Sequence, residues 1–348
     1  MSRPHRFPGR LDVKGGTVDM SHGSGGRAMA QLVTELFIRH FDNAWLRQGN
    51  DQATYSVADG RMVVSTDAHV ISPLFFPGGD IGSLAVHGTI NDVAMAGAAP
   101  RYLSAAFILE EGFPLSELDR IVASMAAASL RAGVPVVAGD TKVVERGKGD
   151  GVFITTTGLG VVPEGVDVSG DRARPGDAIL LSGTIGDHGV AVMSCREHLE
   201  FETEIHSDSA PLHGLVAHMI EAVPGIRCLR DPTRGGLATT LNELALQSGV
   251  GMMVEEERIP VSPAVAAACE LLGLDPLYVA NEGKLVCVCP ADDAERLLSV
   301  MRADALGRRA AIIGRVVEDA HHFVQMRTAF GGVRIIDWLA GEQLPRIC

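Results

Sequence analysis

The chain has 348 residues, which is long enough for two domains of ordinary size. Hydrophobic residues make up 46% of it, aromatic residues only 5%, and 40 residues are glycine, a composition typical of an α/β or α+β enzyme with many tight turns. The formal net charge of −13 argues against nucleic acid as a partner, because binding a phosphate backbone requires clustered Lys and Arg.

The first half of the chain mixes helices and strands. Apolar periodicity predicts helices over 28–40, 81–97 and 115–132, and β-branched runs predict strands over 62–67, 101–109, 134–138 and 152–160. Ser116 is a candidate N-cap for the third helix, and Gly133 is a candidate stop.

A polar stretch with several Gly and Pro, residues 163–175, marks the expected domain boundary. We predict a first domain over 1–165, a second over 166–340 and a flexible tail over 341–348. The second domain is predicted to contain strands over 177–182, 251–255, 284–289 and 311–317, helices over 212–222, 237–248, 265–272 and 291–306, and a turn at Asp187-His188-Gly189. Because strands and helices do not alternate strictly, we expect an α/β fold with mixed sheets.

Neither a targeting segment nor a membrane span is expected. Residues 1–11 lack the apolar run of a signal peptide, and no stretch is long and apolar enough to cross a bilayer. The cysteines show no CxxC pair and no zinc-site spacing; they are Cys195, Cys228, Cys269, Cys287, Cys289 and Cys348. Unpaired thiols fit a reducing compartment, so we expect a cytoplasmic protein.

A glycine-rich loop near the N-terminus suits contact with an anion. It consists of His22, Gly23, Ser24, Gly25 and Gly26, and a predicted helix follows it. Glycines let backbone N–H groups approach a phosphate, and the helix dipole favours negative charge there. The chain has no P-loop motif and no GxGxxG after a strand, so any nucleotide is bound in another way.

Four aspartates stand at the expected ends of strands or in loops beside small residues: Asp67, Asp92, Asp140 and Asp231. Mg²⁺ prefers oxygen ligands, usually one or two carboxylates together with phosphate oxygens and waters. Each aspartate alone would be read as a cap or turn residue, and the set of four indicates a magnesium-phosphate site.

The chain ends in Cys348, preceded by Pro345-Arg346-Ile347. A thiol at the extreme C-terminus can be carried into a pocket and withdrawn, which suits a side chain that is itself modified. The α-carboxylate of the same residue disfavours the thiolate, so we expect a carrier of a group rather than an activated nucleophile.

Taken together, these motifs resemble the aminoimidazole ribonucleotide synthetase-like superfamily. The resemblance is carried in order by His22 to Gly26, Ser65-Thr66-Asp67, Asn91-Asp92, Gly139-Asp140-Thr141-Lys142 and Asp231-Pro232-Thr233-Arg234-Gly235-Gly236. With the Pro-Arg-Ile-Cys ending, the chain is most similar to the HypE family of hydrogenase maturation proteins. The resemblance spans nearly the whole chain.

This resemblance implies a two-domain fold whose N-terminal domains pair across a homodimer, with ATP and Mg²⁺ between the domains. It implies that the carbamoyltransferase HypF loads a carbamoyl group onto Cys348, that ATP-dependent dehydration turns it into a thiocyanate, and that the cyano group passes to iron on the HypC–HypD complex. No nucleic acid or membrane partner is implied.

The same resemblance assigns roles to residues of this chain. The nucleotide-binding residues would be His22, Gly23, Ser24, Gly25, Gly26, Asp67, Asp92, Asp140 and Thr141. The metal ligands would be Asp67, Asp92 and Asp231, with Asp140 as a nearby or further ligand. Lys142 and Glu282 are the candidate bases; Lys142 could equally neutralise phosphate charge, and Glu282 could equally be a cap.

Two other functions stay open at this point. One is a different ATP-using kinase or synthetase of the superfamily, although the absence of any cysteine before Cys195 argues against a selenophosphate synthetase. The other is a non-catalytic carrier whose bound nucleotide only switches its conformation.

Overall fold

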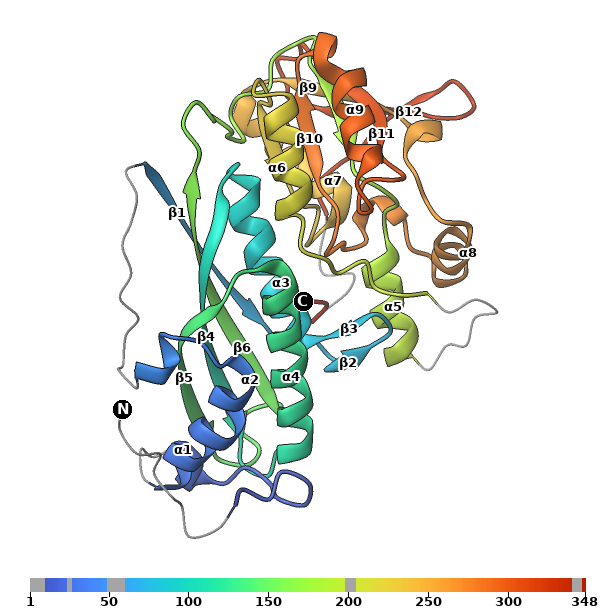
Figure 1. Cartoon of the computed structure of the whole chain (residues 1–348). Coiled ribbons are helices and arrows are strands. Elements are labelled where there is room, and N and C mark those ends of the chain that lie inside the picture. Colours follow the sequence, from blue (N-terminus) through green and yellow to red (C-terminus); the bar gives the residue numbers. More distant parts are fainter. Residues whose placement is uncertain (1–9, 24–26, 49–59, 198–204, 340–345) are drawn as a thin grey trace.

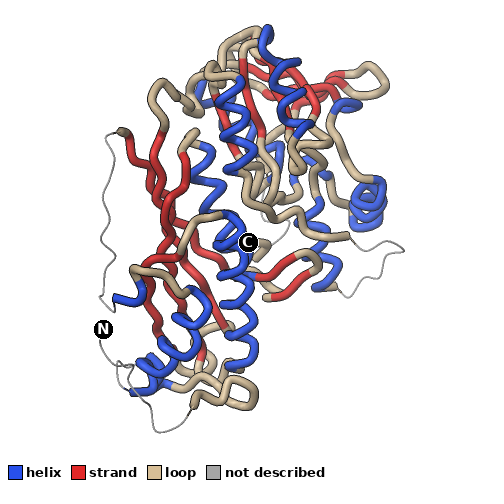
Figure 2. The backbone as a smooth tube through the Cα atoms, in the orientation of Figure 1, coloured by secondary structure: helices blue, strands red, loops and turns tan. Residues whose placement is uncertain are grey.

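The computed structural model describes residues 10–23, 27–48, 60–197, 205–339 and 346–348, which form two domains (Figure 1). Each domain is built on its own mixed sheet, one with four strands and one with seven. Helices pack against the sheets in both domains (Figure 2). The predicted two-domain α/β class with mixed sheets is confirmed, and the boundary between residues 165 and 166 stays a prediction.

The first sheet has the order β1-β6-β4-β5. Its strands are β1 (Arg61–His69), β4 (Ala99–Glu110), β5 (Val136–Val144) and β6 (Val152–Val162). One face is covered by α3 (Ile81–Met95), by α4 (Leu115–Ala132) and by an N-terminal helical segment made of α1 (Arg27–Leu32), the π-helix η2 (Val33–Ile38) and α2 (Arg39–Phe41). A two-stranded ribbon, β2 (Phe75–Phe76) and β3 (Gly79–Asp80), leads into α3.

Helix α3 lies between the two domains and fixes part of the site. Asp80 starts it with a capping box, in which its side chain accepts from Gly82 and Ser83 while Ser83 reaches back to the Asp80 backbone. Gly158 and Gly160 on β6 allow the close approach, since a Cβ on Gly160 would lie 2.4 Å from Val93. The helix is therefore held tightly against the sheet.

The second sheet has the order β13-β12-β9-β11-β7-β10-β8. Its strands are β7 (Ala178–Leu181), β8 (Cys228–Arg230), β9 (Gly251–Glu255), β10 (Val286–Cys289), β11 (Ala311–Val317), β12 (Val324–Arg327) and β13 (Val333–Ile335). The helices of this domain are α5 (Asp187–Arg196), α6 (His213–Ala222), α7 (Gly236–Ser248), α8 (Pro263–Leu272) and α9 (Ala294–Ala303). Alternation along β10 builds two cores: Val286 and Val288 pack with α7, and Cys287 and Cys289 pack with α6 and α9.

Several local predictions are wrong. Strand β5 continues through Gly139 to Lys142, whereas the predicted strand ended at residue 138. Asp187-His188-Gly189 is the first turn of α5, entered from Gly186 at φ +86°. Position Pro114, not Ser116, precedes α4, whereas Gly133 ends that helix in the left-handed region as predicted.

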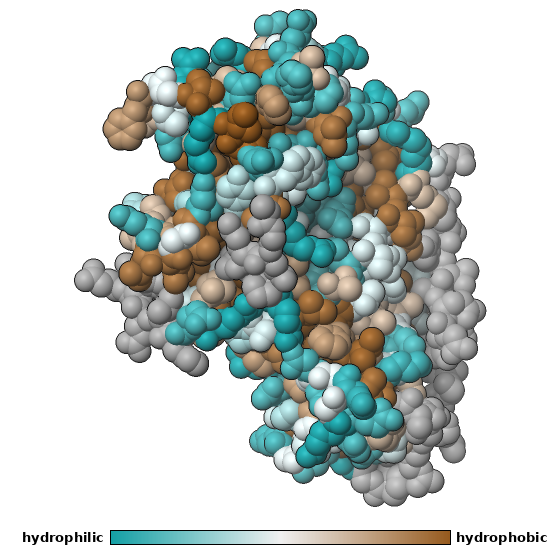
Figure 3. Space-filling model, turned by 180° about the vertical axis from the view of Figure 1, so that it is seen from behind, coloured by the Kyte–Doolittle hydropathy of each residue, from teal (hydrophilic) through white to brown (hydrophobic). Residues whose placement is uncertain are grey.

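The surface seen from behind carries hydrophobic patches scattered among hydrophilic residues (Figure 3). Among the helices of the described segments, none is long and apolar enough to cross a membrane.

Candidate active site

A cavity of about 150 Å³ contains most of the chemistry-bearing residues. It is lined by Asp67, Ala68, His69, Gly88, Asp92, Asp231, Thr233, Arg234, Glu282 and Cys348. These residues come from the first domain, the second domain and the C-terminal tail. Such a volume is smaller than the ~300 Å³ at which small-molecule pockets usually begin, so it fits a small group rather than a whole nucleotide.

The first domain supplies Asp67 from β1 and Asp92 from α3. Ser65, Asp67 and His69 alternate along β1 and face the helix. Ser65 Oγ donates to Asp92 Oδ2 at 2.7 Å, which orients that carboxylate. Gly88 lies one turn before Asp92, and its missing side chain leaves room for Asp67 and Glu282: a Cβ there would stand 3.7 Å from Asp67 Oδ2 and 3.9 Å from Glu282 Oε2.

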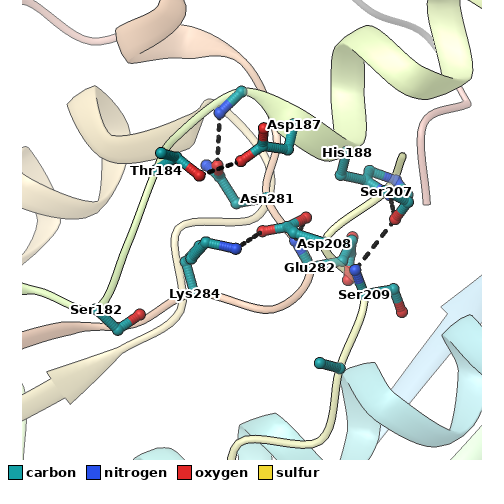
Figure 4. A network of polar contacts seen from close by, with 12 residues as sticks. Ser182, Thr184, Asp187, His188, Ser207, Asp208, Ser209, Asn281, Glu282 and Lys284 are labelled. Atoms are coloured by element: carbon teal, nitrogen blue, oxygen red, sulfur yellow. Dashed lines mark hydrogen bonds and ion pairs between the residues drawn. The ribbon is translucent and has the colours of Figure 1, made fainter. Parts of the chain in front are cut away.

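The second domain supplies two loops that are tied together by Asn281. Its backbone N–H and its side-chain amide both donate to the Pro232 carbonyl, at 3.1 and 2.9 Å. This holds Asp231 and Arg234, which follow β8, beside Glu282, which precedes β10. The Glu282 N–H in turn donates to Asp208 Oδ1 at 3.0 Å. The loop contacts around Asn281, Asp208 and Glu282 are drawn in Figure 4.

Clustering of carboxylates in a buried place raises their pKa values. Burial, followed by repulsion from Asp92, raises the pKa of Asp67 to about 6 and that of Asp231 to about 7. Burial and the neighbouring carboxylates raise the pKa of Glu282 well above its usual value. Arg234 lowers the pKa of Asp67 and so compensates part of the negative charge.

The thiol of Cys348 lies in this pocket. Burial, with a smaller contribution from Glu282, raises the pKa of Cys348 to about 12. The thiol is therefore protonated at neutral pH, which fits the expectation of a carrier rather than an activated nucleophile. The origin differs from the expected one, since burial dominates.

The pocket residues fit a divalent cation that is bound together with phosphate. Throughout the described segments no three His, Cys, Asp or Glu side chains are arranged to hold a metal ion by themselves. Asp67, Asp92 and Asp231 nonetheless offer oxygen donors of the kind that Mg²⁺ takes when phosphate completes its coordination. Glu282 Oε1 is buried without a hydrogen-bond partner among the described residues.

Asp140, Thr141 and Lys142 lie elsewhere in this chain. The strand register aligns Asp67 with Thr156, Ala105 and Gly139, so Asp140 and Lys142 point to the opposite face of the sheet. They are also on β5, three strands and about 14 Å from β1. Asp140 instead pairs with Lys142, Oδ2 to Nζ, at 3.0 Å. The four aspartates thus do not meet within one chain: three gather, and Asp140 does not.

The glycine-rich loop is only partly within the described residues. His22 is buried in the short 3₁₀ helix η1 (Met20–Gly23), which contacts β5 and not the carboxylate pocket. Its Nδ1 accepts from the Asp19 N–H at 3.1 Å. Ser24, Gly25 and Gly26 lie outside the described residues, and so do residues 341–345 of the predicted tail.

Sequence reasoning did not single out His69 and Arg234. His69 follows Asp67 by two residues on the same strand face, which is a signal that period-2 alternation provides. Burial, assisted by Arg234, lowers its pKa to about 4, so the ring is neutral. Arg234 follows Asp231 by three residues in a motif that was noted for its aspartate and its glycines.

Comparison with known proteins shows similarity over nearly the whole chain. The AIR synthase related protein N-terminal domain matches residues 49–162, and the AIR synthase related protein C-terminal domain matches residues 174–327. The chain is 71% identical to carbamoyl dehydratase HypE of Cupriavidus necator, with 97% of each chain covered.

Solved structures agree with this similarity. A crystal structure of hydrogenase maturation protein HypE in complex with ATP matches with a TM-score of 0.92 and 52% identity, covering 94% of this chain and 99% of that one. A HypE chain from a HypE–HypF complex matches with a TM-score of 0.79 and 50% identity, covering 88% of this chain and 99% of that one.

Proposed function

The chain belongs to the AIR synthase related family and, within it, to the carbamoyl dehydratases of the HypE type, and from this premise we propose that it dehydrates an S-carbamoyl group on Cys348 to a thiocyanate with ATP. This reaction would supply the cyanide ligand of the iron in [NiFe]-hydrogenase. The alternative of a non-catalytic carrier does not account for the carboxylates that surround the thiol.

The observation that carries this proposal is the position of the C-terminal thiol. Cys348 lies in the cavity together with Asp67, Asp92, Asp231 and Glu282, which come from both domains. A tail that only transported a group would have no need of a buried acidic pocket. A volume of about 150 Å³ has room for a carbamoyl group and the end of a triphosphate, with the rest of the nucleotide outside.

The chemistry divides into two halves. The carbamoyl oxygen attacks the γ-phosphorus of ATP, and the bond to the ADP oxygen breaks. The nitrogen then loses two protons, the C–O bond breaks, and phosphate leaves with the former carbamoyl oxygen, giving S–C≡N. A bound Mg²⁺ would neutralise phosphate charge. Asp67, Asp92 and Asp231 would hold it, and Arg234 would add a fixed positive charge at the same place.

Of the two candidate bases, Glu282 is the one beside the thiol. Its backbone is fixed by Asp208, and its side chain shares the cavity with Cys348. A carboxylate whose pKa is raised accepts a proton more readily, which suits removal of the protons from nitrogen. Lys142 lies on the opposite face of the first sheet and cannot serve the same pocket from within one chain.

We propose that a second copy of the chain brings Asp140 and Lys142 to the nucleotide, whereas Thr141, which alternates with them, is buried on the helix-covered face. The face of the first sheet that no described helix covers, called here the uncovered face, carries exposed apolar side chains, with Val64 61% and Ile108 42% exposed. Asp140 and Lys142 share that face with them. Apolar surface of this kind supports pairing of two N-terminal domains into a homodimer. Each site would then combine the carboxylate pocket of one chain with β5 of the other.

The partners follow from the chemistry of the tail. In the seated state the Cys348 thiol lies inside the cavity between the domains, so the tail would leave this pocket to meet a carbamoyltransferase. The known HypE–HypF complex supports HypF in this role. The product would return outward to the HypC–HypD complex, and we place this exchange in the cytoplasm.

Mass spectrometry of the intact protein tests the proposal. S-carbamoylated protein incubated with Mg²⁺ and ATP should lose the mass of one water, and Cys348→Ala should show no carbamoylation and no loss. Turnover of ATP without any loss of water would contradict the dehydratase and support the carrier. Phosphorylation of a small molecule such as thiamine phosphate would support the kinase instead.

A further inference from the structure

The last three residues of the chain pair with the segment after β1. The Val70 N–H donates to an oxygen of the Cys348 α-carboxylate and the Ser72 N–H donates to the Arg346 carbonyl, both at 3.1 Å. Arg346 Nε donates back to the Val70 carbonyl at 2.9 Å. Ile347, only 5% exposed, is buried in the main core of the first domain. The tail is thus seated by its backbone as well as by its side chains.

His188 makes the most buried contact with the tail. Its side chain is fully buried, and Nε2 lies 2.8 Å from the Ile347 carbonyl oxygen. A carbonyl can only accept, so Nε2 carries the hydrogen. Burial lowers the pKa of His188, although Asp208 and the Ile347 carbonyl act in the opposite direction, so the ring is neutral. Nδ1 then accepts from Ser207 Oγ at 2.7 Å.

Ser207 in turn fixes the ring. Its Oγ accepts from the Ser209 N–H at 3.1 Å, and its own N–H donates to the Pro77 carbonyl at 2.8 Å. Phe76 packs edge-on against the imidazole, with 5.5 Å between the ring centroids. The orientation of the donor to Ile347 is therefore set by its surroundings and not by the tail (Figure 4).

Arg196, at the other end of α5, holds the preceding carbonyl. Its Nη2 donates to the Arg346 carbonyl at 2.9 Å, and its Nε donates to the Ser72 carbonyl at 3.0 Å. One guanidinium thus bridges the tail and the segment with which it pairs. Successive tail carbonyls, those of Arg346 and Ile347, are bound by the last and second residues of one helix.

The same framework holds Glu282. The Gly186 N–H, just before α5, donates to Asn281 Oδ1 at 2.8 Å, and the Gly189 N–H donates to the Ala280 carbonyl at 3.1 Å. Asp208, next to Ser207, accepts from the Glu282 N–H. One hydrogen-bonded framework therefore fixes the position of His188, which binds the tail, relative to Glu282, which lies beside the thiol.

We propose that His188 and Arg196 are positioning residues, which bind the Ile347 and Arg346 carbonyls and so station the Cys348 thiol, or the group it carries, at Glu282. The role given to these residues rests on the proposed function, but their contacts with the tail can be tested without ATP or a carbamoyl group. The tail is held by hydrogen bonds from a neutral imidazole and a charged guanidinium to its backbone carbonyls. Because these bonds are non-covalent, the tail can be released for loading. Loss of one such bond should change the equilibrium between the seated and the released tail about tenfold.

Alkylation of Cys348 measures the seated state directly, without ATP or a carbamoyl group. Full-length protein carrying Cys195→Ser is treated with iodoacetamide, because Cys195 is the other thiol that is not fully buried. Intact mass follows the label, and a further Cys348→Ser change defines the background. Replacing His188 by Leu, or Arg196 by Met, should raise the alkylation rate about tenfold.

A conservative variant separates positioning from mere structure. In His188→Gln the amide Nε2 can still donate to the Ile347 carbonyl, so the alkylation rate should stay within about twofold of the parent. His218→Leu, on the exposed surface of α6, is the matched control and should change nothing. In single turnovers of carbamoylated protein, His188→Leu should lower the rate constant while leaving the ATP concentration at half-maximal rate unchanged.

An alkylation rate in folded His188→Leu equal to that of the parent would overturn the proposal. If His188→Leu does not fold, Arg196→Met decides in the same way, since Arg196 is partly exposed. Failure of the dehydration reaction already in the parent protein, with the alkylation pattern as expected, would instead reject the proposed function and leave the seating of the tail intact.

Discussion

Lys284 and Asp208 form a buried ion pair beneath the candidate site. Nζ lies 2.9 Å from Oδ2, and the two side chains are only 12% and 4% exposed. Asp208 also accepts the Glu282 N–H, so the pair supports the loop that carries the proposed base. Since Lys284 is two residues after Glu282, the loop is anchored at both positions by one carboxylate.

Breaking this pair should cost far more stability than breaking an exposed one. Lys284→Met leaves a buried carboxylate without its charge partner, and we expect the free energy of unfolding to fall by about 3–5 kcal/mol. Arg334→Met breaks the exposed pair with Asp275 and should cost less than about 1 kcal/mol. Urea unfolding of the two variants measures both. Equal losses would show that Lys284 does not hold the loop.

The same carboxylate should make stability depend on pH at the acid end. Burial raises the pKa of Asp208, but the charge of Lys284 and the hydrogen bonds from Lys284 and the Glu282 N–H lower it more, so the folded value lies below the usual one. A depressed folded pKa contributes stability that is present above the unfolded pKa, about 3.9, and is lost as the pH falls through the folded value. Asp208→Asn should therefore unfold with a flatter dependence on pH below about 4. An unchanged slope would contradict the assignment.

The pocket should lose activity when Gly88 gains a methyl group. In Gly88→Ala the new Cβ would lie 3.3 Å from His69 Cε1 and close to Asp67 and Glu282. Alanine favours a helix by up to about 1 kcal/mol over glycine, so the fold should persist while dehydration slows at least tenfold. Gly214→Ala on α6 is the matched control, because nothing lies within 4 Å of its Cβ. Normal dehydration by Gly88→Ala would mean that the reacting group lies elsewhere.

The sequence predicted the chemistry of the site better than its geometry. Asp67, Asp92, Asp231, Glu282 and Cys348 were all singled out, and the structure brings them to one cavity. The three aspartates and Cys348 follow from local motifs, whereas Glu282 and the reason for grouping all five came from the resemblance to a family. Sequence patterns could not show which face of a strand meets which partner, because that depends on pairing between distant segments.

Asp140 illustrates this limit. It was expected just after the end of a short strand, near the other aspartates, but β5 continues through it, and the register turns its side chain to the face that no described helix covers. His188 illustrates another limit of prediction from the sequence. Its motif, Asp-His-Gly, is typical of a turn, whereas Gly186 provides the left-handed entry to a helix that carries His188 into the interior. In both cases tertiary pairing, which no local pattern encodes, decided the outcome.

Metal and nucleotide should bind together rather than separately. The described residues provide no three-ligand metal group, so Mg²⁺ alone should shift the melting temperature little, as should ATP with a chelator. Mg²⁺ with ATP at a hundredfold excess over its Kd should stabilise the fold by about 2.7 kcal/mol. Asp231→Asn should remove the metal-dependent part, and Asp292→Asn, an exposed residue outside the pocket, should not. A full shift with ATP and chelator would reject the carboxylates as metal ligands.

Mixed dimers should regain activity if each site is built from two chains. Asp67→Asn disables the carboxylate pocket, and Lys142→Ala disables the uncovered face of the sheet. Chains of the two kinds, unfolded together and reassembled, would form mixed dimers in which one site is intact, so we expect about a quarter of the parental activity. Both variants alone should be inactive.

A second mixture provides the control for this experiment. Asp67 and Asp231 line the same pocket of one chain, so a mixture of Asp67→Asn with Asp231→Asn has no intact site and should stay inactive. Recovery in this control would point to a site assembled differently. No recovery in the first mixture, with dimers present, would place Lys142 outside the site altogether, because within one chain β5 and the carboxylate pocket lie on opposite faces of the sheet.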